Sequence, residues 1–305
     1  MEDTETVYEV KDKVIVISDP ELNIHIKVPG NFNLLPKKDK LLVNQTSNPY
    51  QVIVEKDEQD RIIEAYQEKN GVIEGQCLTF YPESGEIQGE MFYQNGHLHG
   101  PSTFYAENKQ VLSKTWFVNG KQEGQLFQYY LGKQIYSRQQ YKTGLLEGEQ
   151  VYYYEDGTLK TRMFYHQGHL EGEVSLYHEN GLLKRQLFFA KGMREGKERQ
   201  WNEQGIMTFE VYYHNNEKIR GQRKWHENGV LKEDTNFLDG IKKFNKKAWD
   251  DDGTLRLNMK FLDDLHCESY FFDEGGESSK IKKGVWNGQH IEWEEEDEEK
   301  ETLDL

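Results

Sequence analysis

The segment Gly148-Glu149-Gln150-Val151-Tyr152-Tyr153-Tyr154-Glu155-Asp156-Gly157-Thr158-Leu159, continuing to Phe164-Tyr165-His166-Gln167-Gly168, is repeated along most of the chain. A glycine opens each repeat at intervals of 24 or 25 residues: Gly75, Gly100, Gly124, Gly148, Gly172, Gly196 and Gly221, with Asn245 in the following slot. A fixed period of this length is the sequence signature of a repeat architecture, so it takes precedence over any single motif.

Two columns of residues predict a β-hairpin in each repeat. An aromatic residue follows the opening glycine by four or five positions, and an aliphatic residue follows a tip that is usually Asx-Gly. A three-residue loop such as Glu179-Asn180-Gly181, with the glycine in the left-handed conformation, sets the two columns opposite each other. The predicted cross-strand pairs are Tyr153–Leu159, Tyr177–Leu183 and Trp225–Leu231. Such aromatic–aliphatic pairs stabilise an antiparallel sheet by roughly 0.2–1 kcal/mol each.

Two tips lack the glycine. Lys109 and Lys133 stand where other repeats have it. A residue with a side chain loses roughly 1–2 kcal/mol in the left-handed conformation, so we expect these two loops to be irregular.

Side chains alternate between the two faces of a strand, which assigns a face to each residue of the return strand. Leu159, Thr161, Met163 and Tyr165 share one face, and Lys160 and Arg162 point the other way. Four aromatic residues lie on this second, mostly polar face near the strand ends: Phe92, Trp116, Phe164 and Phe188. We expect them to be exposed, and they are the candidate partner-binding residues.

The sequence therefore predicts an all-β fold, an elongated repeat array of antiparallel β-hairpins in one long twisted sheet over residues 51–293. Residues 7–17, which include Val14 to Ile17, predict a strand, and the alternation from Leu22 to Val28 predicts another. We interpret residues 1–50 as an N-terminal β cap and connector for the array, with a separate binding module as the alternative. Residues 294–305 are strongly acidic and predict a disordered tail, or alternatively a segment that engages a basic partner surface.

The repeat resembles the MORN repeat family, and the bacterial variant more closely than the standard eukaryotic form. Gly172, Tyr177, Asn180-Gly181, Leu183, Phe188-Phe189 and Gly192 carry the resemblance, together with their equivalents over residues 51–293. The standard form has a second glycine and a Tyr-x-Gly where this chain has Val174, Lys184 and Gln186. The resemblance implies a β-hairpin sheet that serves as a protein-binding scaffold. It also implies two alternatives, an antitoxin of a toxin–antitoxin pair and a lipid-binding array, and it supplies no catalytic residues.

Composition narrows the classes of partner. The chain has 305 residues, 35% hydrophobic and 30% charged, with a net charge of −16. This balance disfavours nucleic acid and anionic membranes, both of which attract basic proteins. No apolar run approaches the ~18 residues of a membrane helix, and the N-terminus does not resemble a secretory signal. We expect a cytoplasmic protein, with export without a classical signal peptide left open; the oligomeric state does not follow from the sequence.

No residue pattern predicts a catalytic, cofactor or metal site. His97 and His99 are the best-spaced metal pair, but no third ligand is near them in sequence. The other histidines share repeat positions with amides, which is typical of polar turns. Glu147, Glu171 and Glu195 follow the period, which is typical of a solvated edge. Cys77 and Cys267 form no disulfide framework, and the chain has no nucleophile elbow or phosphate loop. We therefore expect a non-enzymatic interaction protein without cofactors.

Overall fold

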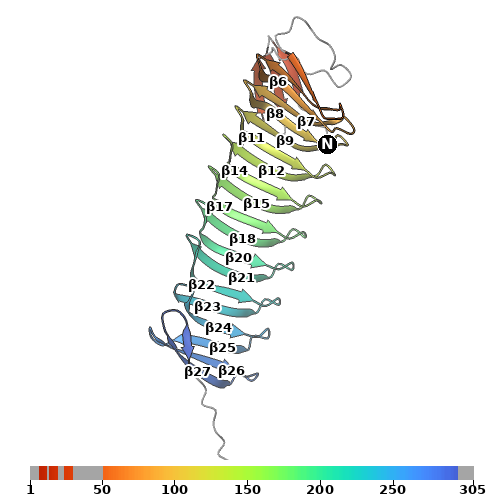
Figure 1. Cartoon of the computed structure of the whole chain (residues 1–305). Helices are drawn as coiled ribbons and strands as arrows, with labels where there is room; N and C mark the ends of the chain where they lie inside the picture. The colour runs from red at the N-terminus through yellow and green to blue at the C-terminus, as the bar shows by residue number, and fades with distance from the viewer. Residues whose placement is uncertain (1–6, 12–13, 20–23, 30–50, 295–305) are drawn as a thin grey trace, which may run out of the picture. The chain divides into compact units, whose positions relative to one another are not determined.

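The computed structural model describes residues 7–11, 14–19, 24–29 and 51–294, and the first three ranges contribute backbone only (Figure 1). The predicted connector, at residues 36–50 of the predicted N-terminal cap, and the acidic tail from residue 295 lie outside the described residues. The chain divides into two compact units, Met1–Leu170 (unit 1) and Glu171–Leu305 (unit 2). All regular structure in the described ranges is β-strand.

Three strands near the N-terminus form a small sheet of their own. They are β1 (Val7–Lys11), β2 (Val14–Asp19) and β3 (Ile24–Pro29), paired antiparallel in that order. The single strand predicted over residues 7–17 is in fact a hairpin, because Lys11 pairs with Val14 and Val10 with Ile15. The alternating segment forms β3 as predicted. That residues 1–50 cap the array stays a prediction.

The repeat region of unit 1 is a meander of antiparallel strands. The strands are β4 (Gln51–Lys56), β5 (Ile62–Lys69), β6 (Val72–Phe80), β7 (Ile87–Gln94), β8 (His97–Tyr105), β9 (Val111–Val118), β10 (Lys121–Gln122), β11 (Gly124–Tyr129), β12 (Ile135–Lys142), β13 (Leu145–Leu146), β14 (Gly148–Tyr153), β15 (Leu159–His166) and β16 (His169–Leu170). A compact apolar cluster of Ala65, Leu78 and Phe80 lies near its start, packed against Val54, Ile62 and Ile87.

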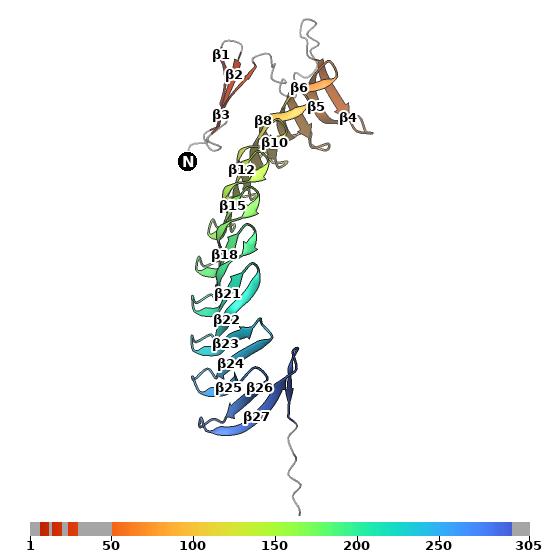
Figure 2. The same ribbon diagram turned by 90° about the vertical axis from the view of Figure 1, so that its left-hand side faces the viewer.

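Unit 2 continues the same pattern. The strands are β17 (Gly172–Tyr177), β18 (Leu183–Ala190), β19 (Met193–Arg194), β20 (Gly196–Trp201), β21 (Met207–His214), β22 (Glu217–Trp225), β23 (Leu231–Asp239), β24 (Lys243–Trp249), β25 (Leu255–Phe261), β26 (His266–Phe272), β27 (Ser278–Trp286) and β28 (Ile291–Trp293). Strands β4 to β16 of unit 1 pair antiparallel with their chain neighbours, and strands β17 to β28 of unit 2 do the same, so the predicted all-β repeat array is confirmed. Figure 2 shows how strongly the individual hairpins curve.

The predicted register of the hairpins is confirmed. Tyr153 pairs with Leu159 and Tyr177 with Leu183, and the equivalent pair in β22 and β23 is Trp225–Leu231. In the Tyr177 hairpin, the amide of Gly181 donates to the His178 carbonyl at 2.9 Å. Gly181 has φ +81°, the left-handed conformation that the three-residue loop requires.

The two tips with lysine in place of glycine are regular, contrary to expectation. Lys109 and Lys133 adopt φ of 70° and 69°, and their amides donate to Ala106 and Tyr130 at 2.8 and 3.0 Å, as the tip glycines do in their own loops. The paired strands on either side fix the loop closely enough to hold a lysine in the left-handed region. The irregular tip is instead the one with Gly85, whose amide reaches back four residues to Tyr81 at 2.7 Å.

The second connection of each repeat is a two-residue turn followed by a bulge. In the turn between β15 and β16, Gln167 and Gly168 have φ of 50° and 79°, which is the type I′ conformation that suits a tight hairpin. The chain then makes two residues of strand and bulges at Glu171 before the opening glycine, Gly172, whose φ is 82°. The opening glycine is therefore a bulge residue within the hairpin.

Candidate binding surfaces

Tips of consecutive repeats are tied together by the residue that follows the aromatic column. His178 Nε2 donates to the Trp201 carbonyl and His226 Nε2 to the Trp249 carbonyl, both at 2.9 Å. The hydroxyl of Tyr130 donates to the Tyr153 carbonyl at the same distance. The two histidines are thus structural, as a polar turn position predicts, with the partner now identified as the next repeat.

The periodic glutamates lie on an exposed edge as expected, and they also form structural hydrogen bonds. The Glu147 carboxylate accepts the amide of Gln167 at 2.7 Å and Nδ1 of His166 at 3.0 Å. The equivalent glutamates of other repeats accept the same kind of bond. The amides of Thr143, Lys191 and Asn215 donate to the carboxylates of Glu123, Glu171 and Glu195, respectively. The amide of Gln167 and the His166 ring lower the pKa of Glu147, so the carboxylate stays ionised.

The four predicted aromatic residues occupy one row of the sheet, which we name the aromatic row, but they differ in exposure. Phe92 and Trp116 are 3% and 0% exposed, so the expectation that they are exposed is wrong. Phe164 and Phe188 are half-buried. Whether any of the four binds a partner stays a prediction.

The reason for the burial lies in the neighbouring strand. Each row residue precedes an opening glycine by eight positions, and Phe92 and Phe188 lie beside theirs. A Cβ at Gly100 would lie 3.2 Å from Cβ of Phe92, and one at Gly196 would lie 3.7 Å from Cβ of Phe188. The missing side chain lets the ring pack against the next strand. The eight-residue spacing was the sequence signal that could have revealed this contact.

The aromatic row is interrupted at Gln140, which stands 24 residues after Trp116 and 24 before Phe164. A pocket of about 280 Å³ lies at this interruption. Its lining residues are Trp116, Val118, Glu123, Gly124, Gln140, Tyr141, Lys142 and Glu147. The pocket therefore combines an aromatic wall with two carboxylates already bonded to backbone amides, and sequence reasoning did not single it out.

The buried indole of Trp116 is not fully satisfied. Its Nε1 has no hydrogen-bond partner among the described residues. A buried N–H without an acceptor costs free energy, about 1–3 kcal/mol in mutational data. Gln140, the non-aromatic residue in the row, lines the same pocket as this indole.

The face of unit 1 opposite the aromatic row carries no Asp, Glu, Lys, Arg or His between β7 and β15. Apart from the aliphatic residues next to the hairpin tips and turns, such as Leu159 and Leu98, the strand pairing places 17 side chains on it, which together with the intervening glycines we name the neutral face. They are Met91, Tyr93, Ser102, Phe104, Ser113, Thr115, Phe117, Leu126, Gln128, Ser137, Gln139, Tyr141, Gln150, Tyr152, Thr161, Met163 and Tyr165.

Several tyrosines of the neutral face lie close together and stay uncharged. Burial raises the pKa of Tyr152, and the nearby Tyr141 and Tyr165 raise it further. Burial and Tyr165 do the same for Tyr141. The rings of Tyr152 and Tyr136 meet edge to face with centroids 5.9 Å apart. The hydroxyls are therefore neutral donors and acceptors at physiological pH.

Several of the equivalent repeat positions in unit 2 carry charged side chains, and these form ion pairs. Arg185 and Glu198 form an ion pair at 2.7 Å, and Glu233 contacts both Lys224 and Lys246 at 2.9 Å. The side chain of Glu198 is only 3% exposed, so Arg185 supplies the counter-charge for a buried carboxylate.

The two cysteines are buried and free. Burial raises the pKa of Cys77 far above its usual range, and a hydrogen bond from its Sγ to Glu64 adds to the effect. Burial also raises the pKa of Cys267. Both thiols stay protonated and are poor nucleophiles. In the described part of the chain, no group of three or more His, Cys, Asp or Glu side chains is arranged to hold a metal ion.

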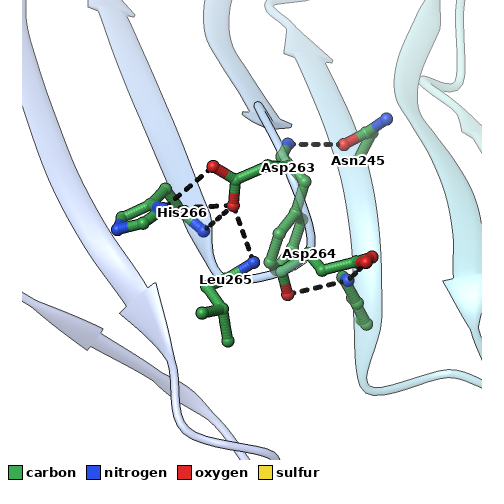
Figure 3. Close-up of polar contacts among 7 residues, drawn as sticks. Asn245, Asp263, Asp264, Leu265 and His266 are labelled. Carbon is green, nitrogen blue, oxygen red and sulfur yellow. Dashed lines mark hydrogen bonds and ion pairs between the residues drawn. The ribbon is translucent and has the colours of Figure 1, made fainter.

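An acidic turn in unit 2 has its carboxylates occupied (Figure 3). Asp263 Oδ1 accepts the amides of Leu265 and His266 at 2.8 Å, and Nδ1 of His266 lies 2.9 Å from Oδ2. These bonds lower the pKa of Asp263 to about 2. The side chain of Asn245, in the slot of an opening glycine, accepts the amide of Phe261 at 2.8 Å. Asp263 and Asn245, which both depart from the repeat pattern, thus stabilise this turn.

Comparison with known proteins identifies the repeat. Residues 146–167 and 170–191 match the family model described as MORN repeat variant, so these two repeats are MORN-variant repeats as the resemblance predicted. No curated protein sequence matches this chain. Within the described residues, no helix has the length and apolar character needed to cross a membrane.

Solved structures with partial similarity are parts of much larger chains. A crystal structure of TcdB2-TccC3-TEV is 11% identical over 79% of this chain, with a TM-score of 0.17. A Tc holotoxin pore from Photorhabdus luminescens is 9% identical over 90% of this chain, with a TM-score of 0.19. This chain spans only 15% and 16% of the length of those chains. Similarity this weak carries no argument about fold or function.

Proposed function

We propose that this chain, which is built of MORN-variant repeats, is a non-enzymatic scaffold that binds a protein partner in the cytoplasm. The observation that carries the proposal is the pocket at Gln140, where the aromatic row is interrupted. The periodic histidines and glutamates are used in bonds between repeats, whereas Gln140 is the one residue that separates Trp116 from Phe164 in the aromatic row. A partner side chain inserted between Trp116 and Phe164 would replace the missing aromatic ring and bury the half-buried Phe164 further.

The test is to fill the pocket and to trim its exposed neighbours. Gln140→Phe restores the aromatic row, so we expect it to abolish partner binding while leaving the circular dichroism spectrum unchanged. Phe164→Ala and Phe188→Ala should weaken binding. Tyr165→Ala and Phe189→Ala change the next residue of the same strands, which faces the other side, and serve as matched controls.

The measurement is affinity capture from cells that naturally make the chain, followed by titration of the captured protein with each purified variant. Affinity unchanged in Gln140→Phe and in both phenylalanine variants would remove the aromatic row from the proposal. Capture by a version lacking residues 294–305 shows separately whether the acidic tail holds the partner.

The net charge of −16 favours a second candidate function, an antitoxin that binds and neutralises a basic toxin. Co-expression with the protein encoded next to it should then rescue growth from toxicity. The lipid-binding alternative predicts sedimentation with anionic vesicles that weakens as salt rises. Absence of vesicle binding at low salt excludes it.

A further inference from the structure

We infer that the neutral face of unit 1 is a self-association surface that binds a second copy of this chain. The inference goes beyond the proposed function, since the face lies on the side of the sheet opposite the aromatic row. It rests on three properties of the face: its lack of charge, its hydrogen-bonding chemistry and its area.

Charge is the first argument. Of all residues in the chain, 30% are charged, yet no charged side chain lies on this face across the seven strands β7, β8, β9, β11, β12, β14 and β15. The equivalent positions in unit 2 hold Arg185, Glu198, Lys224, Glu233 and Lys246. Solvated sheet faces ordinarily carry such residues, so their exclusion from the stretch between β7 and β15 indicates a covered surface.

The same lack of charge favours a second copy as the occupant. Two chains of charge −16 repel each other. In a symmetric dimer the same patch of each copy meets its counterpart, so a charged patch would bring like charges together at the contact. The neutral face avoids this contact repulsion. A strongly basic or acidic partner would gain nothing there, because its charges would lose water without meeting a counter-charge.

Hydrogen-bonding chemistry is the second argument. The polar groups of the face are the hydroxyls of Ser, Thr and Tyr and the amides of Gln, each able to donate and to accept. A surface made of such groups is complementary to its own copy, whereas a surface of lysines or of carboxylates is not. Phe104, 39% exposed on this face, supplies an apolar contact that water leaves uncovered.

Area is the third argument. Seven strands spaced ~4.8 Å apart, with six to nine residues each at ~3.3 Å, give a face on the order of 700 Å². A stable interface of standard size buries about 800 Å² on each partner. The neutral face therefore has close to the area that a dimer requires.

The experiment is sedimentation equilibrium of the full chain from about 1 to about 100 µM, where mass action converts monomer to dimer. We expect a mass of twice 36.1 kDa at the upper concentrations. Association should strengthen between about 0.05 M and about 0.5 M NaCl, because salt screens the repulsion between two acidic chains. A monomer at every concentration and at both salt levels would overturn the inference.

Two matched variants locate the contact. Thr161→Lys places a cation on the neutral face, and Gln125→Lys places one on the opposite face of the same unit. Both lower the net negative charge by one, which by itself favours association. We expect Thr161→Lys to weaken dimerisation at least about tenfold, since each copy would bury an unpaired ammonium, and Gln125→Lys to leave it unchanged or tighter. A dimer that survives Thr161→Lys but not Gln125→Lys would place the contact elsewhere.

Discussion

Units 1 and 2 share one repeat and one hairpin register but stabilise it with different chemistry. Unit 1 holds its strands with buried aromatic, amide and hydroxyl side chains, such as Trp116, Gln150 and Ser137, each 0% exposed. Unit 2 places Arg185, Glu198 and other paired charges at the equivalent positions. The backbone contacts that define the repeat are thus independent of the side chains between them.

The difference separates what every repeat needs from what each unit adds. The tip loops, the type I′ turns and the Glu-to-amide bonds recur in both units, for example at Glu147 and at Glu195. The face positions vary freely between neutral and charged residues. Variable positions on a constant frame are where specific binding evolves most easily, which directs attention to the neutral face and to the pocket at Gln140.

The largest expected effect comes from the aromatic row of unit 1. Trp116→Ala removes a fully buried ring and should destabilise the protein by about 3–5 kcal/mol. Phe188→Ala, at the same repeat position in unit 2, removes a half-buried ring and should cost about 1–2 kcal/mol. Urea unfolding monitored by circular dichroism measures both. Equal losses would show that burial along the row does not differ between the units.

Moving a charge into unit 1 should have the next largest effect. Gln150 is 0% exposed, and its amide bonds the backbone of Gln140 at 3.0 and 3.1 Å. Gln150→Glu keeps the shape but buries a carboxylate on a face without cations, so we expect a loss of about 2–4 kcal/mol at neutral pH. The loss should shrink near pH 4, where the carboxyl group is neutral. A pH-independent loss would show a steric cause.

The hairpin register was predictable from sequence, whereas the contacts between repeats were not. Tyr153 faces Leu159 because a three-residue loop and the two-residue period of a strand leave no other register. The burial of Trp116 depends on the bulge that follows on the neighbouring strand. The bond from Glu147 to Gln167 spans 20 residues and depends on the φ of the turn. The alternation of residues along a single strand predicts neither the bulge nor the φ of the turn.

The candidate pocket was visible in the sequence only as a difference between repeats. Gln140 departs from the aromatic residues at the equivalent positions, and the departure has a meaning once the row is known to pack against the opening glycines. The left-handed lysines at the tips show the opposite case. Their departure from glycine changes nothing in the loop, because the flanking strand pairs fix its geometry.

The reverse change in unit 2 should have a smaller effect than Gln150→Glu. Glu198→Gln removes the partner of Arg185, but the guanidinium keeps access to water, since its side chain is 38% exposed. We expect a loss of about 1–2 kcal/mol, reduced by high salt. Thermal unfolding at low and high NaCl measures it. A larger loss than that of Gln150→Glu would contradict the view that unit 2 tolerates charge changes better than unit 1.

Acid should weaken both units through the Glu-to-amide bonds. The pKa of Glu147 is lowered by the Gln167 amide and the His166 ring, and that of Glu195 by the His214 ring and the Asn215 amide. A lowered folded-state pKa contributes stability above the usual value of 4.5, and this stability is lost as the pH falls through the folded-state pKa. Urea midpoints between about pH 3 and about pH 6 should fall with pH, and Glu147→Gln should flatten the slope. A slope unchanged in Glu147→Gln would assign the acid sensitivity to other carboxylates.

The smallest expected effect is at the tips. Lys133 in unit 1 has φ 69° where Gly181 in unit 2 has φ 81°. Lys133→Gly relieves the left-handed strain but raises the entropy of the unfolded chain, so the two terms nearly cancel and we expect a gain of about 0–1 kcal/mol. Gly181→Lys introduces the strain without a compensating contact and should cost about 0.5–1 kcal/mol, the difference between the same two terms. Thermal unfolding measures both changes in the free energy of unfolding. A gain for Lys133→Gly and a loss for Gly181→Lys would show that the tips of both units adopt the same geometry with either residue. A loss in both exchanges would mean that the Lys133 side chain stabilises its own tip, and the tips would then join the positions at which the two units differ.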